Sequence, residues 1–397
     1  MAERAVTHLF THVRGLSGVE SMVRRHLRDD PQAGLTPSAV SFFEQGDFTQ
    51  VGFAKQVSGL GLTGSASGWT FRRRFQGAIA HHPVGHRIYH EAWGLPPLAD
   101  LDRAQRRFAF LHSHWTGAEN IFRGLRGLVD GIFCVSPAIR SAVRTCLPEI
   151  PEERLITIRN PVDPPPSHLI LPPRRQNPEM VLGFCGRVVS QPKRVERLPD
   201  LARRLHARRI PHRWEILGDG PDRASLEEAF QQTGVPAHFH GAQTGEAVWR
   251  ILAGWDVIVF ASDFEGMPLA LLEALSVGVL PLFPRLASGG RDTTEAIAPE
   301  LVYESGQLDD AVRAVAWLRQ QTPETWEQLR ERGRQRLVPH SGTVYLRTYA
   351  DFLDRIATLP RLSAEGPAAR RRHLGEWMPF SLLKRLPASH PLRREYL

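Results

Sequence analysis

Short apolar runs alternate with amphipathic stretches along most of the chain. The first run, at residues 5–10, is followed by a glycine-containing turn and by helical spacing over residues 19–27. This succession predicts a strand, a turn and a helix. Later apolar runs predict further strands, separated by helical or loop stretches, at 86–90, 107–112, 131–136 and 155–160. The alternation indicates parallel β/α units, which fold as a doubly wound α/β domain.

A proline-dense stretch interrupts this pattern at residues 160–180. Proline disfavours both a helix and a central strand, so we expect a linker at 166–180. A second alternation follows, with strands predicted within 181–188, 213–220, 237–243, 255–262 and 279–284. We therefore predict two Rossmann-like domains, at 1–165 and 181–345.

Helical patterns at 311–321 and 345–359 precede a basic C-terminal stretch. Residues 366–397 carry seven Lys or Arg and two acidic residues, so much of the net charge of +8 gathers there. A solvated tail or a packed helix explains this charge, and so does attachment to anionic lipid. We expect residues 346–397 to form a helix and a tail that packs on the N-terminal domain or lies at a membrane face.

The composition narrows the class of protein. Hydrophobic residues make up 42% and charged residues 23% of the 397 residues, which fits a folded globular protein rather than a disordered or fibrous one. Three cysteines have neither the number nor the spacing of a disulfide framework or zinc site, so a reducing cytoplasm is expected. The first residues lack the apolar core of a secretory signal, and no run of eighteen apolar residues occurs. Any contact with a membrane is therefore expected to be peripheral.

Two cations follow the first strand predicted for the second domain. Arg187 comes directly after that strand, and Lys193 stands six residues later, before a helix expected near Val195. Ligands of open α/β sheets bind at the carboxyl ends of strands, where two cations can neutralise a pyrophosphate without a metal. Ordinary surface charge is the alternative explanation.

Two acids frame an apolar helix at residues 264–275. Glu265 lies in the turn before the helix, Pro268 near its first turn, and Glu273 about one and a half turns further on. A helix N-terminus suits a phosphate, and a carboxylate can accept two hydrogen bonds from a diol such as ribose. Together these features indicate a nucleotide-sugar. A capping acid before an ordinary amphipathic helix is the alternative.

Two other motifs are weaker. Gly218 and Gly220 form a strand-to-helix turn, but the third position of the dinucleotide fingerprint is Arg223, which disfavours a nicotinamide cofactor. Asp100 and Asp102 resemble a metal–nucleotide motif, yet their proline-rich context favours a helix cap.

In their order along the chain, the short motifs resemble those of the retaining glycosyltransferases of family 4, which have the GT-B fold. The resemblance covers most of residues 5–350 and is densest over 181–282. It rests on SGVE (17–20), DGIFCVS (130–136), RNPVD (159–163), GRVVSQPK (186–193), LGDGP (217–221), FHGA (239–242) and EGMPLALLE (265–273). It implies two Rossmann-like domains that face a central cleft, with the donor held mainly by the C-terminal domain.

The resemblance also implies roles for single residues. Arg187 and Lys193 match the cations that stabilise the leaving pyrophosphate, Glu265 the acid that contacts the transferred sugar, and Glu273 the acid that holds the ribose. The remaining donor contacts fall on Gly18, Gly266, Met267, Pro268 and Leu269. Gly18 matches a glycine loop that commonly has two adjacent glycines, whereas Ser17 stands at the first position here.

The N-terminal domain is expected to bind the acceptor. His112 matches a histidine near the anomeric centre of the donor sugar, although a structural histidine at a strand end is the alternative. The acceptor side is expected to include His90, Trp93, His114 and Trp115. Transfer with retention is implied, through same-face attack assisted by the leaving phosphate, and no separate nucleophile is evident.

The predicted function is transfer of a sugar from a nucleoside-diphosphate-sugar to a glycan or lipid-linked acceptor, in surface polysaccharide, lipopolysaccharide or glycolipid assembly. Arginines among aromatics, at 72–76, 102–108 and 122–127, fit such an acceptor at an anionic membrane surface, and solvated helices fit them equally well. No metal, further cofactor or nucleic acid is expected. The alternatives are a GT-B sugar-nucleotide epimerase or hydrolase, and a non-catalytic sugar-nucleotide-binding subunit.

Overall fold

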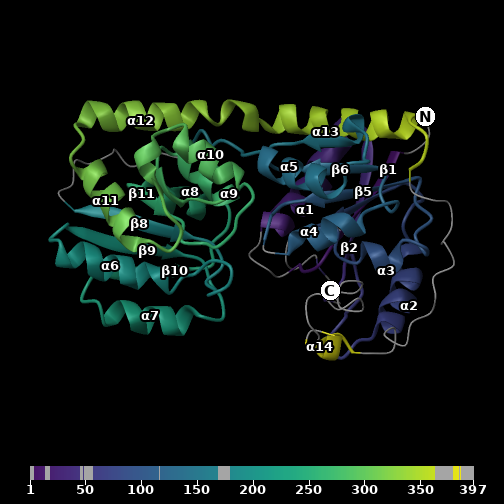
Figure 1. Ribbon diagram of the computed structural model, residues 1–397, viewed down its shortest axis with the longest axis horizontal. Helices are drawn as coiled ribbons and strands as arrows, with labels where there is room; N and C mark the ends of the chain where they lie inside the picture. Colours follow the sequence, from purple (N-terminus) through teal and green to yellow (C-terminus); the bar gives the residue numbers. More distant parts are fainter. Residues whose placement is uncertain are drawn as a thin grey trace. The chain divides into compact units, whose positions relative to one another are not determined.

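The chain folds into two compact α/β units (Figure 1). The computed structural model describes residues 4–13, 18–44, 48, 57–115, 117–168, 179–362, 379–383 and 385. The first unit comprises Met1–Ile158 and Leu346–Leu397, and the second comprises Arg159–Tyr345. Much of the predicted linker and most of the basic tail lie outside the described residues.

The described strands of the first unit form one parallel sheet in the order β3-β2-β1-β4-β5-β6-β7. Their bounds are β1 Arg4–Phe10, β2 Leu35–Ser41, β3 Val57–Gly59, β4 His86–His90, β5 Arg106–Leu111, β6 Gly131–Cys134 and β7 Leu155–Thr157. The chain leaves β1 toward one edge of the sheet and later returns to the other side of β1 at β4. This reversal places a crevice at the carboxyl ends of β1 and β4, where ligands of such sheets bind.

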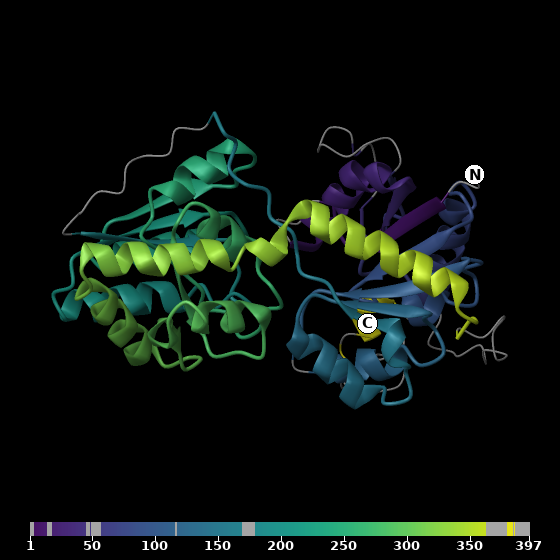
Figure 2. The same ribbon diagram turned by 90° about the horizontal axis from the view of Figure 1, so that it is seen from above.

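Helices cover this sheet, and the last long helix of the chain packs on it (Figure 2). In α13, Phe352 contacts the rings of Phe108 and Phe133 from β5 and β6. Apolar burial of this kind holds residues 346–358 to the unit. The helical elements are α1 Gly18–Asp29, η1 Asp30–Ala33, α2 Gly68–Ile79, α3 Leu95–Leu98, α4 Ala118–Gly124, α5 Pro137–Cys146, η3 Glu152–Arg154, α13 Gly342–Thr358 and α14 Phe380–Leu383.

The described strands of the second unit form a parallel sheet in the order β10-β9-β8-β11-β12-β13. They are β8 Met180–Cys185, β9 His212–Leu217, β10 Ala237–Gly241, β11 Val257–Val259, β12 Leu280–Pro284 and β13 Val302–Tyr303. The reversal of strand order lies between β8 and β11. The helical elements are α6 Arg197–Ala207, α7 Arg223–Gln231, α8 Glu246–Ala253, α9 Leu269–Ser276, α10 Gly289–Glu295, η4 Pro299–Leu301, α11 Leu308–Arg319, α12 Pro323–Gln335 and η5 Val338–His340.

The predicted fold class and every predicted strand are confirmed, but three strands and one local motif differ from expectation. The sequence patterns did not predict β2, β3 or β13; β2 contains Pro37, and the other two are very short. The helix cap expected at Asp100 and Asp102 is wrong, because both residues follow α3 rather than start a helix. Asp100 instead pairs with Arg72 (Nη2–Oδ2 2.6 Å), and Asp102 accepts a hydrogen bond from the Tyr89 hydroxyl (2.8 Å).

Close packing at β8 requires a glycine. A Cβ on Gly183 would lie 2.0 Å from the indole ring of Trp255, which is buried just before β11. Because β11 pairs with β8 at this level, neither strand can move aside without losing the ladder between them.

We expect Gly183→Ala to destabilise the second unit by about 1–3 kcal/mol, because the added methyl overpacks the sheet. Gly77→Ala is the control, since Gly77 lies within α2 and a Cβ there meets no atom within 4 Å. That substitution should stabilise its helix by up to about 1 kcal/mol. Thermal unfolding followed by circular dichroism measures both changes, and equal effects of the two substitutions would refute this account of the packing.

Candidate active site

Two glycine turns set the loop that carries Arg187. Gly186 follows β8. A Cβ on Gly218 would lie 1.8 Å from the carbonyl oxygen of Gly186. Gly218 also has φ +143°, which favours glycine. A Cβ on Gly220 would come within 2.1 Å of the Val188 carbonyl oxygen. Gly218 and Gly220, after β9, thus allow the loop after β8 to pack closely against them. Within that loop, Arg187 is exposed.

Lys193 and Glu265 meet beyond the carboxyl ends of β8 and β11. The Lys193 Nζ lies 2.6 Å from the Glu265 Oε1, and the Ser262 hydroxyl donates to the same oxygen at 2.7 Å. Glu265 is 8% exposed. A carboxylate this buried needs a partner, and Lys193 supplies it. Two residues predicted from separate motifs are therefore brought into direct contact.

Neighbouring side chains hold the two loops together. Asp263 accepts hydrogen bonds from Arg194 and, at 2.8 Å, from the Arg197 Nη2. Its own backbone N–H donates to the Pro192 carbonyl at 3.0 Å. These bonds position Lys193 against Glu265 from both sides. Sequence reasoning missed them, because Asp263 and Arg197 alone look like ordinary surface charges.

The turn into α9 is fixed through its carbonyl groups. The Asn160 Nδ2 donates to the Met267 carbonyl at 2.9 Å, and the His340 Nδ1 donates to the Asn160 carbonyl at 2.5 Å. The Gly290 N–H faces the Gly266 carbonyl at 3.4 Å. The N-terminus of α9 begins at Leu269, directly after Pro268. Its backbone amides are held in place beside Glu265, where an anion can be bound.

Glu273 lies further along α9. Burial, reinforced by the negative charge of Asp163, raises the pKa of its carboxyl to about 7. Burial also raises the pKa of the Cys185 thiol, and the charge of Glu273 adds to this effect at the end of β8. Glu273 can therefore both accept and donate hydrogen bonds near neutral pH, which suits a diol. Asp163 and Cys185 were not predicted as members of this site.

In the first unit, two predicted histidines form a direct contact. The His90 Nδ1 lies 2.8 Å from the His112 Nε2, and the two rings are stacked. Burial, aided by the charge of His26, lowers the pKa of His112 to about 3. Beside them, the Ser113 hydroxyl donates to Glu91 at 2.7 Å, and burial raises the pKa of Glu91 to about 7. Burial also lowers the pKa of His90, so both histidines are neutral at physiological pH.

The other predicted residues lie in different settings. Trp93 packs against the rings of Phe42, Phe43, Phe71 and Phe380. His114 pairs with Glu119 of α4 at 2.9 Å, and Trp115 is partly exposed. Gly18 is the exposed first residue of α1, while residues 14–17 lie outside the described chain. The roles of these residues stay predictions.

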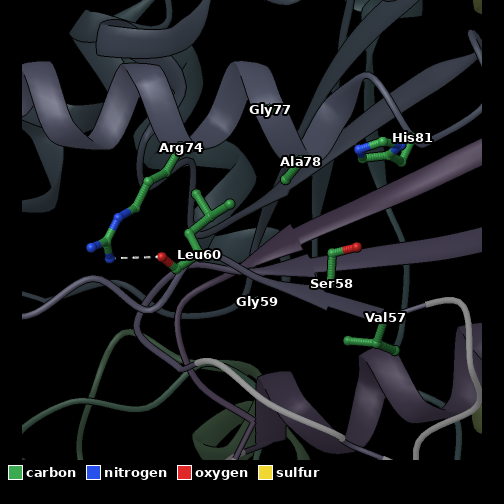
Figure 3. Close-up of a pocket in the computed structure, with 8 residues that line it drawn as sticks. All are labelled: Val57, Ser58, Gly59, Leu60, Arg74, Gly77, Ala78 and His81. Atoms are coloured by element: carbon green, nitrogen blue, oxygen red, sulfur yellow. Dashed lines mark hydrogen bonds between the residues drawn. The ribbon is translucent and has the colours of Figure 1, made fainter.

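An open pocket of about 720 Å³ lies elsewhere in the first unit (Figure 3). Within it the Arg74 Nη1 donates to the Leu60 carbonyl at 2.9 Å. None of the predicted site residues lines it, so we assign it no part in the chemistry. Its lining residues are Val57, Ser58, Gly59, Leu60, Arg74, Gly77, Ala78 and His81.

Comparison with known proteins places a glycosyltransferase domain in the second half of the chain. Residues 172–336 match the family described as "Glycosyl transferases group 1". This segment holds Arg187, Lys193, Glu265 and Glu273. It therefore contains the ion pair and both acids of the candidate site.

Curated relatives include a GDP-mannose-dependent alpha-mannosyltransferase of Mycobacterium tuberculosis (33% identical; 37% of this chain, 38% of the relative). Another is the lipopolysaccharide 1,6-galactosyltransferase of Salmonella typhimurium (29% identical; 36% of this chain, 40% of the relative). A third is the sulfoquinovosyl transferase of Arabidopsis thaliana (34% identical; 30% of this chain, 23% of the relative). The chain spans about a quarter to two fifths of the lengths of these three relatives.

Solved structures share the fold over most of the chain. The lipopolysaccharide outer core galactosyltransferase WaaB matches 88% of this chain and 99% of its own, at 19% identity and a TM-score of 0.63. The pneumococcal O-GlcNAc transferase GtfA, solved with UDP and GlcNAc, matches 90% of this chain and 100% of its own, at 11% identity and a TM-score of 0.72. Among the described helices of the present chain, none is long and apolar enough to cross a membrane.

The raised pKa of Glu273 makes stability depend on pH. The unfolded chain releases this proton near pH 4.5, whereas the folded chain holds it to about 7. Between these values the folded state binds the extra proton, so wild-type stability should fall with rising pH relative to Glu273→Gln, and level off above about 7. Thermal unfolding of both proteins from pH 4.5 to 8 measures the difference.

The exposed Glu300→Gln variant gives the baseline for loss of one carboxylate. A gap between wild type and Glu273→Gln that stays constant across this range would contradict the assigned burial of Glu273.

Proposed function

We propose that this protein is a retaining, metal-independent glycosyltransferase that uses a nucleoside-diphosphate-sugar donor. The observation that carries the proposal is the contact between Lys193 and Glu265, with Glu273 on the adjoining helix, inside a group 1 glycosyl transferase domain. A cation for phosphate and two acids for hydroxyl groups match the chemistry of such a donor.

The donor is arranged along the carboxyl ends of the second sheet. Its ribose binds at Glu273, its pyrophosphate at Arg187, Lys193 and the N-terminus of α9, and its sugar at Glu265 and the turn Gly266–Leu269. Lys193 remains a cation for phosphate while it contacts Glu265, because an ammonium group has three donors and Glu265 takes one. The site thus orders the ribose, diphosphate and sugar in sequence.

The reaction proceeds by attack of an acceptor hydroxyl on the anomeric carbon from the face that the phosphate leaves. The bond from that carbon to the phosphate oxygen breaks with its electron pair, and the leaving phosphate takes the proton of the acceptor. Arg187 and Lys193 stabilise the charge that develops on the phosphate. His112, at the end of β5, is assigned a hydrogen bond to a substrate hydroxyl.

The acceptor is a glycan or a lipid-linked sugar at the cytoplasmic face of a membrane. A relative named as a lipopolysaccharide 1,6-galactosyltransferase supports this class of substrate. On α2, Trp69 is 42% exposed, and the Arg73 guanidinium lies 5.4 Å from the centroid of its ring. An exposed aromatic beside a cation suits the interface of an anionic membrane, which supports peripheral attachment.

Substitutions in the donor site should abolish most transfer. We expect Lys193→Ala, Arg187→Ala and Glu265→Ala each to lower the rate of transfer by about a hundredfold to a thousandfold, because each removes a group that acts on the transition state. Thermal-shift screening against UDP-, GDP- and ADP-sugars first identifies the donor, and product analysis then measures the rate. Arg208→Ala, which breaks a surface pair with Asp309, is the control and should keep the wild-type rate.

Near-wild-type rates in all three site variants would overturn the site. A rival function, as a sugar-nucleotide epimerase or hydrolase, predicts that the purified protein consumes the donor without any acceptor. A non-catalytic binding subunit predicts a thermal shift with the donor and no turnover under either condition.

A further inference from the structure

Four buried or half-buried side chains form a continuous chain of hydrogen bonds in the first unit, here named the histidine chain: Asp30, His8, His90 and His112. The Asp30 Oδ2 lies 3.3 Å from the His8 Nε2. The His8 Nδ1 lies 3.1 Å from the His90 Nε2, and the His90 Nδ1 lies 2.8 Å from the His112 Nε2. The chain begins at a fully buried carboxylate and ends at a partly exposed imidazole.

The topology of the sheet explains why these residues meet. His8 lies on β1, His90 ends β4, and His112 follows β5, and these three strands are neighbours in the sheet. Asp30 begins η1, directly after α1, and its other oxygen faces the His26 Nδ1 at 2.9 Å. The carboxyl ends of β4 and β5 thus carry the last two members at the edge where ligands bind.

The charge state of Asp30 gives the chain a direction. Although burial alone would raise the pKa of Asp30, the charge of His26 and the hydrogen bonds from both imidazoles lower it. The ionised carboxylate can only accept hydrogen bonds, so the His8 Nε2 must carry a proton and donate a hydrogen bond to Asp30. Burial lowers the pKa of His8, His90 and His112, so all three rings are neutral at physiological pH.

A neutral imidazole carries one proton, and this fixes each following contact. Because the His8 Nε2 donates to Asp30, the His8 Nδ1 must accept from the His90 Nε2. The His90 Nδ1 must then accept from the His112 Nε2. The His112 Nδ1 is left as a lone pair, able to accept a hydrogen bond.

We propose that Asp30, His8 and His90 are positioning residues that hold His112 in a single tautomer, with its proton on Nε2 and Nδ1 presented as an acceptor. The inference rests on the proposed function in one respect, since the hydroxyl that Nδ1 accepts from belongs to a substrate of that reaction. A free imidazole exchanges between two tautomers. The histidine chain disfavours the tautomer of His112 with its proton on Nδ1 before the substrate binds.

A second contact supports this role. Glu91, next to His90, accepts hydrogen bonds from the Ser113 hydroxyl and from the backbone at His112 and Ser113. Glu91 and Ala92 both have φ +56°, a conformation that costs energy for residues other than glycine. The backbone of His112 is therefore held by Glu91, and its ring by the histidine chain.

The test is the nitrogen spectrum of the imidazoles in full-length protein labelled with 15N-histidine, recorded at neutral pH without ligand. In wild type we expect His8, His90 and His112 each to give the pattern of a single tautomer with the proton on Nε2. In His90→Phe, His112 loses its partner and should give the averaged pattern of two exchanging tautomers. His8→Phe removes the hydrogen-bond acceptor of the His90 Nε2, and it should have the same effect on His112 through His90.

His86→Phe is the matched control, because His86 is a buried histidine of the same strand, β4, and lies outside the histidine chain. It should leave the pattern of His112 unchanged. A proton on Nδ1 of His112 in wild type would overturn the proposal, and so would an unchanged His112 pattern in folded His90→Phe and His8→Phe. The wild-type spectrum decides the first point even where a variant fails to fold.

Activity separates this inference from the proposed function. With the donor identified by thermal shift, His90→Phe should lower kcat for transfer by about tenfold or more while the donor KM changes by less than about threefold. His86→Phe should retain the wild-type kcat. Absence of transfer in the wild-type protein with every donor would refute the proposed function but leave the tautomer result intact. A single Nε2–H tautomer with an unchanged kcat in His90→Phe would refute the role of the chain in transfer.

Discussion

The parallel pairing of β8 with β11 is the constraint on which the proposed donor site depends. Parallel strands end at the same edge of a sheet, so the loop after β8 and the loop after β11 must emerge side by side. The reversal of strand order at this pair leaves the space beyond their ends uncovered by a crossover connection. Gly183 lets the two strands approach, since Trp255 occupies the position that a side chain would need. Lys193 and Glu265 then meet as a consequence of the topology.

Both units bury titratable side chains. Glu265 has Lys193 and Ser262 as partners, whereas Glu273 sits near the like charge of Asp163 and has its pKa raised. In the first unit, burial keeps three histidines neutral in a chain of hydrogen bonds that begins at one carboxylate. Arrangements of this kind cost stability and are found where a protein binds or transforms a ligand. In each unit, some of these costly polar groups lie at the carboxyl ends of the strands.

Most strands, and the contact between two of the predicted donor residues, could be anticipated from the sequence because these signals are local. Apolar runs mark buried parallel strands, and Arg187, Lys193, Glu265 and Glu273 stand at strand ends or helix starts where spacing is informative. The short edge strands β3 and β13 carry too few residues for a pattern, and Pro37 hides β2. The hydrogen bonds that join Asp30, His8, His90 and His112 could not be predicted, because the fold brings these residues together and no sequence spacing records their contacts. For the same reason, the sequence did not predict that Asp163, Cys185 and Asn160 belong to the candidate site.

The most direct measurement of the central claim is an equilibrium titration that compares a nucleoside diphosphate with the corresponding nucleoside. If Lys193 and its neighbours bind the diphosphate, Lys193→Met should weaken binding of the diphosphate by about tenfold or more and leave binding of the nucleoside nearly unchanged. Equal losses for both ligands, or no binding of UDP, GDP or ADP by the wild-type protein, would contradict the account.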